Sequence, residues 1–371
     1  MENNNDNKVL NVPHLRFPEF SGEWKKCKLG DLCNVLMCKR ILVSQTNTED
    51  GVPFYKIGTI GSTPDAYISK ELFDDYKVKY NYPRKGEVMI TCAGTVGKCV
   101  VYDGEDAYFQ DSNIVWIDNP TQYISNGFLF HLLSKVDWRK LNSTTIIRIY
   151  NDDLRNLKMS YPRKEEQQKI SHLLSLLDER IATQNKIIEK LQSLIKGLAV
   201  ALTTKEKANI AISQCLECHS STLQESEVLS SGLCKVFGAN GLVGYKDVPQ
   251  MNGDAILVIK DGSGVGTVSY AQGKFSVIGT LNYLTVIGNN DLRYLYFALS
   301  VFNFQPYKTG MAIPHIYFKD YGKAKIYCPS LAEQKRVANA LDKLESKLFV
   351  EQELLASFNQ QKLYLLGKMF I

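Results

Sequence analysis

The sequence predicts an α/β protein with an internal repeat. Two mixed α/β segments are each followed by a long helix, and the two helices pair as an antiparallel coiled coil. The first observation is the spacing of apolar residues from Ile170 to Leu202, which alternates between steps of four and three residues. That spacing is typical of a long helix packed along a partner helix. The second observation is that a shift of 167 residues carries this series onto another of the same kind, from Val337 to Met369. The partner helix is therefore predicted to lie in the same chain.

The two apolar series define the seam along which the helices are predicted to pack. Its apolar members are Ile170, Leu174, Leu177, Ile181, Ile188, Leu191, Ile195, Leu198 and Leu202, followed by Val337, Leu341, Leu344, Leu348, Leu355, Phe358, Leu365 and Met369. Gln184 interrupts the first series, and the equivalent position of the second holds Glu351; Lys362 is the other polar member. Matched polar residues fix the register of paired helices at some cost in stability. We expect an antiparallel pair, because a duplicated chain closes most simply around a pseudo-twofold axis.

The patterns divide the chain into four parts. An α/β segment at residues 1–160 precedes a helix at 161–204, and a second α/β segment at 205–328 precedes a second helix at 329–371. Residues 13–24, which we call the N-terminal arm, contain three aromatic residues and two prolines and suit an extended, docking segment. Short β-type runs separated by turn residues follow the arm. They are Val52–Ile60, Glu87–Thr91, Lys98–Tyr102 and Ile114–Ile117, and a helix is predicted at Asn126–Lys140.

The second α/β segment repeats this order in a shorter form. Gly86 before the run at 87–91 corresponds to Gly253, which begins an apolar run ending at Lys260. A glycine-rich turn follows in both halves, as CAGTVG ending at Gly97 and DGSGVG ending at Gly266. A second helix is predicted at Leu292–Phe302 in the place of the one at 126–140.

Composition sets the outer limits of function. The chain has 371 residues, 44% hydrophobic and 22% charged, as in ordinary globular proteins. No apolar run approaches the length of a membrane span, and the N-terminal stretch lacks the apolar core of a secretory signal. Nine scattered cysteines are typical of a reducing compartment, so a cytoplasmic location is predicted. A formal net charge of +5 permits an acidic partner such as nucleic acid without requiring one.

The motifs that resemble catalytic sites are better explained as structure. Cys215, Cys218 and His219 have the spacing of c-type haem attachment, but they lack an export context and a second pair of zinc ligands. The glycine turn ending at Gly266 is followed by a β-type run, whereas a dinucleotide loop must open a helix. We interpret both glycine turns as tight turns that bring the backbone close to the chain or to a ligand. The sequence makes no case for catalysis or for a metal.

Two turn-rich segments on a rigid spacer suit a ligand with two sites at fixed separation, and duplex DNA is such a ligand. Polar and basic residues near the turns are the candidate DNA contacts. They are Lys39, Arg40, Lys56, Thr95, Lys98, Gln110, Asn113 and Arg148 in the first segment, and Lys260, Ser263, Thr267, Asn282, Lys308 and His315 in the second.

Three stretches resemble the specificity subunit of type I restriction-modification enzymes. They are PHLRFPEFSGEWKKCKLGDL from Pro13, the Gly-Thr-Val-Gly turn, and the helix start carrying Pro162, Glu166, Gln167, Leu173, Leu174, Leu177, Asp178 and Ile181. The resemblance covers both halves. It implies two target recognition domains, each reading one half of a split, asymmetric site in double-stranded DNA. It also implies helices that set the spacing and dock two methyltransferase subunits, with restriction subunits joining further out.

The same resemblance implies a subunit without catalytic residues, whose partner methyltransferase binds S-adenosylmethionine. The second half departs from the pattern, with Glu345 in place of Asp178 and a shorter recognition segment. Two rival hypotheses are a coiled-coil scaffold with duplicated α/β interaction domains that does not bind DNA, and a nucleotide-binding enzyme. The first leaves the repeated α/β segment unexplained, and the second needs a helix after the glycine turn.

Overall fold

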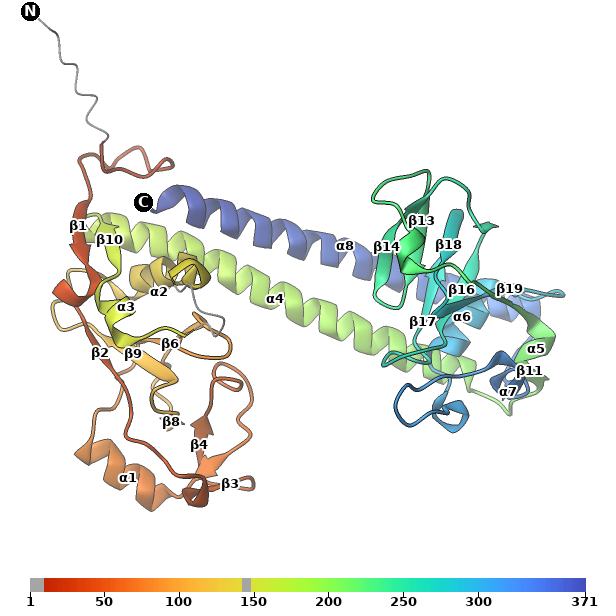
Figure 1. Cartoon of the computed structure of the whole chain (residues 1–371), viewed down its shortest axis with the longest axis horizontal. Coiled ribbons are helices and arrows are strands. Elements are labelled where there is room, and N and C mark those ends of the chain that lie inside the picture. Colours follow the sequence, from red (N-terminus) through yellow and green to blue (C-terminus); the bar gives the residue numbers. More distant parts are fainter. Residues whose placement is uncertain (1–9, 142–147) are drawn as a thin grey trace, which may run out of the picture. The chain divides into compact units, whose positions relative to one another are not determined.

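The computed structural model describes residues 10–141 and 148–371 of the chain (Figure 1). They form two compact units. Unit 1 takes the chain up to Thr183 together with Leu355–Ile371, and unit 2 is Gln184–Leu354. The long helices are α4 (Lys164–Thr203) and α8 (Leu331–Met369), and each of them contributes one half to unit 1 and the other half to unit 2. Both helices lie where the apolar series predicts them.

Within unit 1 the halves of α4 and α8 run antiparallel, as predicted. The guanidinium of Arg180 lies 5.6 Å from the ring centre of Phe358. Nearer the start of α4, Ile170 shares a core with Leu366 and Met369, which lie further along α8. Residues further along α8 therefore contact residues nearer the start of α4. The arrangement buries the apolar stripe of each helix half against the other.

Unit 2 shows the same antiparallel pairing with the opposite halves. The side-chain amide of Gln184 donates to the backbone carbonyl of Glu351 at 2.9 Å and to its carboxylate at 2.5 Å. Ala199, near the end of α4, shares a core with Val337 and Leu341, near the start of α8. The predicted polar pair is confirmed, and every seam position in both helices is buried or half-buried.

The main sheet of unit 1 has four antiparallel strands in the order β2-β9-β6-β7. They are β2 (Asn34–Leu36), β9 (Ile114–Asp118), β6 (Val88–Thr91) and β7 (Cys99–Val101), with β1 (Lys25–Lys28) and β10 (Lys158–Tyr161) forming a separate pair. Helix α2 (Asn126–Lys135) buries Phe128, Leu129 and Leu133 in the core that the sheet shares with α4. α3 (Asn151–Arg155) is a short connecting helix.

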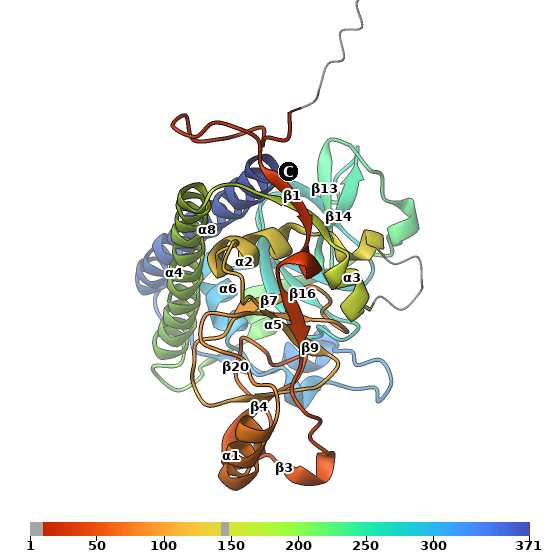
Figure 2. The same cartoon turned by 90° about the vertical axis from the view of Figure 1, so that its left-hand side faces the viewer.

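A second, smaller sheet in unit 1 has the order β3-β5-β4-β8 and pairs β4 with β8 in parallel. Its strands are β3 (Thr46–Asn47), β5 (Tyr67–Ile68), β4 (Val52–Tyr55) and β8 (Tyr108–Phe109). Helix α1 (Lys70–Lys79) follows β5 and begins where the Ser69 hydroxyl accepts from Leu72 N. Figures 1 and 2 both place α1 and β3 on the side of the main sheet that faces away from α4.

Unit 2 repeats the topology of the main sheet, which confirms the internal duplication. Its main sheet has the order β12-β19-β16-β17, and its second sheet, β14-β13-β18-β15, also contains one parallel pair. The strands are β12 (Leu216–Ser220), β19 (Leu281–Val286), β16 (Ala255–Ile259), β17 (Val268–Ala271), β14 (Gly241–Lys246), β13 (Cys234–Gly238), β18 (Lys274–Val277), β15 (Met251–Asn252), β11 (Ile210–Ala211) and β20 (Lys325–Ile326). The helices between them are α5 (Ile212–Cys215), α6 (Leu292–Ser300) and α7 (Phe318–Tyr321).

Three predicted elements end at least two residues earlier than the sequence indicated. The strand predicted at Val52–Ile60 ends at Tyr55, because Lys56 N donates to the Thr59 hydroxyl at 3.0 Å and turns the chain. The helix predicted to reach Lys140 ends at Lys135, where Val136 adopts an extended conformation. The helix predicted to reach Phe302 ends at Ser300.

A pair of repeat-related glutamines fastens each long helix to its α/β segment. The Gln167 carbonyl accepts from Ser125 N, the N-cap of α2, at 2.7 Å, while its amide donates to Pro162 O at 2.9 Å. Gln334 makes the matching bonds to Asp291 N, the N-cap of α6, and to Pro329 O, both at 2.8 Å. Both glutamines are buried, so the bonds satisfy backbone groups that water cannot reach.

The N-terminal arm packs on the start of α4 in unit 1. Buried Glu166 accepts from Arg16 Nε and Nη2, each at 2.7 Å, and from the indole of Trp24 at 3.3 Å. This bidentate contact raises the pKa of Arg16. Leu15 N donates to Lys368 O at 2.8 Å, and the Trp24 ring packs on Phe370. The arm therefore contacts both the first turn of α4 and the last turn of α8.

Candidate nucleic-acid interface

The glycine turns bring the backbone close to an aromatic residue of the same chain. Gly94 and Gly97 have φ of 65° and 84°, a region that favours glycine. A Cβ on Gly97 would lie 2.1 Å from Trp138. In unit 2 a Cβ on the equivalent Gly266, which has φ of 88°, would lie 2.9 Å from Phe304. Each turn continues into a strand, β7 or β17, as predicted, and the close neighbour is the chain itself.

Two adjoining cavities in unit 1 gather most of the predicted DNA contacts of that half. The smaller, of about 410 Å³, is lined by Arg40, Lys56, Gln110, Asn113 and Arg148 among others. The larger, of about 690 Å³, is lined by Lys39, Arg40, Lys79 and Tyr80. Both cavities share Arg40, Asp111 and Ser112. We call them the paired cavities. Six of the eight predicted residues of the first segment lie there.

Positive charge dominates the rim of the paired cavities, although several of the cations have partners. Arg40 Nε lies 2.8 Å from the Asp111 carboxylate, with the arginine largely exposed. Lys56 Nζ lies 2.9 Å from the Asp65 carboxylate. An exposed ion pair such as that of Lys56 contributes little to stability, so a polyanion could take over this cation at small cost.

The turn between β8 and β9 supplies the polar floor of the smaller cavity. Ser112 has φ of 59°, a conformation that costs energy for a non-glycine residue. Arg148 Nη2 donates to Ser112 O at 3.0 Å and supports the turn. Gln110 Oε1 is buried without a hydrogen-bond partner among the described residues. A buried acceptor in that state is ready to receive a donor from a ligand.

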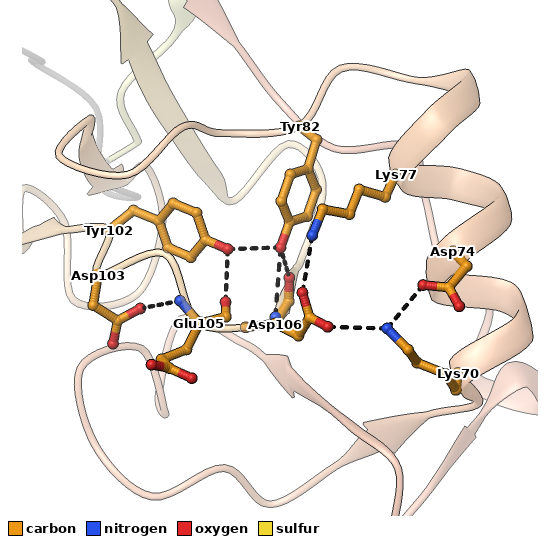
Figure 3. Close-up of polar contacts among 9 residues, drawn as sticks. Lys70, Asp74, Lys77, Tyr82, Tyr102, Asp103, Glu105 and Asp106 are labelled. Atoms are coloured by element: carbon orange, nitrogen blue, oxygen red, sulfur yellow. Dashed lines mark hydrogen bonds and ion pairs between the residues drawn. The ribbon is translucent and has the colours of Figure 1, made fainter.

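A polar network holds α1 beside the larger cavity (Figure 3). Lys70 and Lys77 each donate to the Asp106 carboxylate at 2.9 Å, which lowers the pKa of Asp106. Beside Lys77 the hydroxyls of Tyr82 and Tyr102 lie 2.8 Å apart. Tyr82 also donates to Ala107 O at 2.7 Å. The network ties α1 to the loop before β8, and thereby positions Lys79 and Tyr80 at the cavity.

Thr95 and Lys98, also predicted DNA contacts, lie outside the paired cavities. Thr95 Oγ1 donates to Ile57 O at 3.2 Å, and Lys98 Nζ donates to Ile60 O at 2.5 Å. Both bonds tie the glycine turn to the segment after β4. Conversely, sequence reasoning missed Lys79, Tyr80, Asp111 and Ser112, because none belongs to a motif and only the fold brings them to the cavities.

The predicted residues of unit 2 divide between a loop cluster and the sheet. Asp261 and His315 form a β-bridge, and Thr309 and His315 form another, so the loops that carry Lys260, Ser263 and Lys308 lie together. Asn282 instead is buried in β19, where its side chain accepts from the Ser220 hydroxyl at 2.9 Å. Thr267 is exposed at the end of the glycine turn.

Cys215, Cys218 and His219 are distributed along α5 and β12. Cys215 is buried, and His219 stacks on Tyr283 with its Nε2 2.9 Å from the Thr285 hydroxyl. In residues 10–141 and 148–371 no group of three or more metal-ligating side chains is assembled. In those ranges, too, no helix is both long and apolar enough to cross a membrane.

Comparison with protein families finds a match over most of the chain. The model described as the type I restriction modification DNA specificity domain matches residues 21–193 and again residues 219–360. The chain is 46% identical over 200 residues to a type I restriction enzyme specificity subunit of Haemophilus influenzae, covering 54% of this chain and 47% of that protein. A specificity subunit of Methanocaldococcus jannaschii is 25% identical over 212 residues, covering 53% of this chain and 49% of that protein. The chain thus spans about half the length of these curated relatives.

Solved structures share the fold at low sequence identity. The crystal structure of a type I restriction-modification system S subunit from M. genitalium superposes with a TM-score of 0.68 at 19% identity, covering 97% of this chain and 99% of that one. A chain from a study of assembly and conformational transition in a type I restriction-modification system gives 0.52 at 16% identity, covering 93% and 97%. These likenesses support the architecture of two repeated units with long helices.

Proposed function

Because the chain belongs to the family of the type I restriction modification DNA specificity domain, we propose that it is the DNA-recognition subunit of a type I restriction-modification complex. The observation that carries the proposal is the repetition. The main sheets of the two α/β segments share one strand order, and each segment is fastened to a long helix by an equivalent glutamine. Each segment would read one half of a split, asymmetric site in double-stranded DNA.

In the first half, the paired cavities are the proposed DNA surface. Lys39, Arg40 and Lys56 would meet phosphates, which fix position and orientation without reading sequence. Gln110 and Asn113 would meet base edges, because side-chain amides pair with adenine through two hydrogen bonds. Asp111 could accept from the amino group of cytosine once DNA phosphate draws Arg40 away. In the second half the corresponding surface is the loop cluster around Lys260, Lys308 and His315.

The long helices are the proposed docking surface for two methyltransferase subunits. Helix α8 exposes Phe349, Val350 and Leu354 within unit 2, and Leu363 and Tyr364 within unit 1. Exposed apolar groups of this size on a helix already paired along its other face support protein docking. The methyl transfer, and the S-adenosylmethionine it consumes, would belong to the docked subunits, and restriction subunits would join the complex through them. The chain itself would carry no catalysis.

A domain exchange tests this function. Residues 1–160 would be replaced by the equivalent segment of a relative with another target, and the methylome of cells that express the chimera with its methyltransferase subunit would be sequenced. One half of the methylated sequence should change while the other is kept. Loss of both halves would contradict the modular model. Failure of duplex DNA to bind with or without the methyltransferase would favour a scaffold protein instead.

A further inference from the structure

Two charged positions at the start of each long helix have different ion-pair partners in the two units. In unit 1, Glu166 and Lys169 both bind the N-terminal arm, Glu166 through Arg16 and Lys169 through Glu19. The equivalent residues 167 positions later are Glu333 and Arg336. They contact each other instead, with Arg336 Nη2 3.5 Å from Glu333 Oε1. Glu166 is 1% exposed at its side chain, whereas Glu333 is 32% exposed.

The helix starts are otherwise equivalent, so this difference comes from the missing arm. Gln167 and Gln334 adjoin the two glutamates and make matching bonds to an N-cap backbone amide and a proline carbonyl. The strand pairs that precede the helices, β1 with β10 and β11 with β20, are equivalent as well. The chain before β11 is the end of α4 and a short polar link, and it provides no arginine for Glu333.

A cavity in unit 2 is bordered by Thr203, the equivalent of a residue that the arm covers in unit 1. It measures about 270 Å³, and its lining includes Thr203 and Tyr327. Their unit 1 equivalents are Phe370 and Ser160, 167 residues away in either direction. Phe370 packs on the Trp24 ring with centroids 6.5 Å apart, and Ser160 Oγ accepts from Asn11, just before the arm, at 3.2 Å. Thr203 thus borders an open cavity in unit 2, whereas its equivalent Phe370 is covered by Trp24 of the arm; Ser160, like Tyr327, borders a cavity.

We propose that Glu333, Arg336 and this cavity form a docking site for an extended segment of a partner protein, which we call the unit 2 docking site. The segment should carry the chemistry of the arm: an arginine for Glu333, an acid three residues later for Arg336, and an aromatic side chain for the cavity. In the arm these are Arg16, Glu19 and Trp24. The chain's own arm is held in unit 1, so the occupant comes from another protein. This proposal does not depend on DNA binding.

The probe is a fluorescent synthetic peptide of residues 13–24, titrated into the full-length chain and followed by anisotropy. We expect saturable binding of one peptide per chain. Glu333→Gln should weaken binding roughly tenfold or more, because it removes a charge-assisted bidentate contact. Glu353→Gln, at an exposed position further along the same helix, should leave the affinity unchanged. A charge exchange adds a gain of function: a Glu333→Arg chain should bind the peptide carrying Arg16→Glu better than the natural peptide.

Three results would overturn the assignment. The first is no saturable binding. The second is binding that Glu333→Gln leaves intact but Glu166→Gln removes, because the peptide would then be exchanging with the arm in unit 1. The third is a dimer of the chain in sedimentation that the peptide dissociates, because the site would then be filled by a second copy. DNA binding of the Glu333→Gln variant, measured with a methyltransferase partner, should be retained, so a failure of this proposal stays separate from a failure of the proposed function.

Discussion

Lys362 lies with its ammonium 2.5 Å from the carboxylate of Asp178, so the one lysine of the helix seam is neutralised inside unit 1. The other carboxylate oxygen of Asp178 lies 3.9 Å from Nδ1 of buried His131 on α2. The Ser175 hydroxyl lies 3.5 Å from the other ring nitrogen of His131. A cation, an anion and a titratable ring therefore share one edge of the unit 1 core.

This cluster predicts that unit 1 loses stability in mild acid. Burial, assisted by the charge of Lys362, lowers the pKa of His131 to about 4, although Asp178 opposes the shift. Because the unfolded chain binds a proton near pH 6.5 and the folded chain does not, the free energy of unfolding should fall as pH drops from about 6.5 to about 4. The full effect is roughly 3 kcal/mol. Denaturant unfolding of His131→Gln should show a flatter pH dependence, whereas exposed His172→Gln should match the natural chain; equal slopes in all three would refute the assignment.

The polar pair in the seam predicts an asymmetric response to mutation. Glu351→Ala removes one acceptor of Gln184, whose side chain is buried, and should lower the free energy of unfolding by about 1–3 kcal/mol. Replacing both residues by leucine should raise stability above that of the single variant, at the expense of register. Chemical denaturation checks both effects, with exposed Gln352→Ala as the control. A double variant less stable than the single one would count against a register role.

The ion pair between Arg16 and Glu166 predicts that loss of the arginine destabilises unit 1 at the start of α4. Arg16→Ala leaves the buried Glu166 carboxylate without its cation, which should destabilise unit 1 by about 3–5 kcal/mol. Hydrogen exchange of the start of α4 is the measurement, and Arg163→Ala, exposed beside the same helix start, is the control. If Arg16→Ala left exchange there unchanged, the arm would not be a structural part of unit 1.

The paired cavities predict two kinds of DNA-binding variant. Gln110→Ala should relax specificity at a single base pair by about 1–3 kcal/mol while keeping the salt dependence. Arg40→Ala should weaken binding to all sequences and lower the slope of log affinity against log salt by about one. Anisotropy with duplexes that differ at single positions, over a range of salt, separates the two. Identical behaviour of both variants would mean that the cavities do not divide phosphate from base contacts.

Helix length predicts the spacing of the two half-sites. One heptad inserted at matched positions of α4 and α8 adds about 10 Å, or roughly three base pairs at ~3.4 Å each. Methylome sequencing should then recover the same half-sites with a longer spacer. An insertion of three residues, which breaks the seam register, is the control and should abolish methylation. Changed half-sites after the heptad insertion would be inconsistent with a spacer role.

The long helices were predictable because their signal is local and periodic. The steps from Ile170 to Leu202 determine the seam, and Gln184 and Glu351 mark its register. Helix α1 was not predictable, because Phe73 is its only buried residue and Asp106, distant in sequence, holds Lys70 and Lys77. The residues of the candidate site likewise fall into a predictable and an unpredictable group. Basic residues near turns could be named in advance, but Lys98 binds the Ile60 carbonyl, and Asp111 and Ser112 reach the cavities only through the turn before β9.

The inclusion of residues 355–371 in unit 1 bears on how the chain is made. Leu366, Met369 and Phe370 belong to the same core as Trp24, Phe128 and Leu174. On the ribosome, the residues of unit 1 that precede α4 must therefore wait for residues 355–371 before their core can close, whereas unit 2 lies within one uninterrupted stretch, Gln184–Leu354. Domains generally fold in the order of synthesis, and here that order is reversed. A premature stop within codons 355–371 would accordingly damage unit 1, most of which is translated before unit 2.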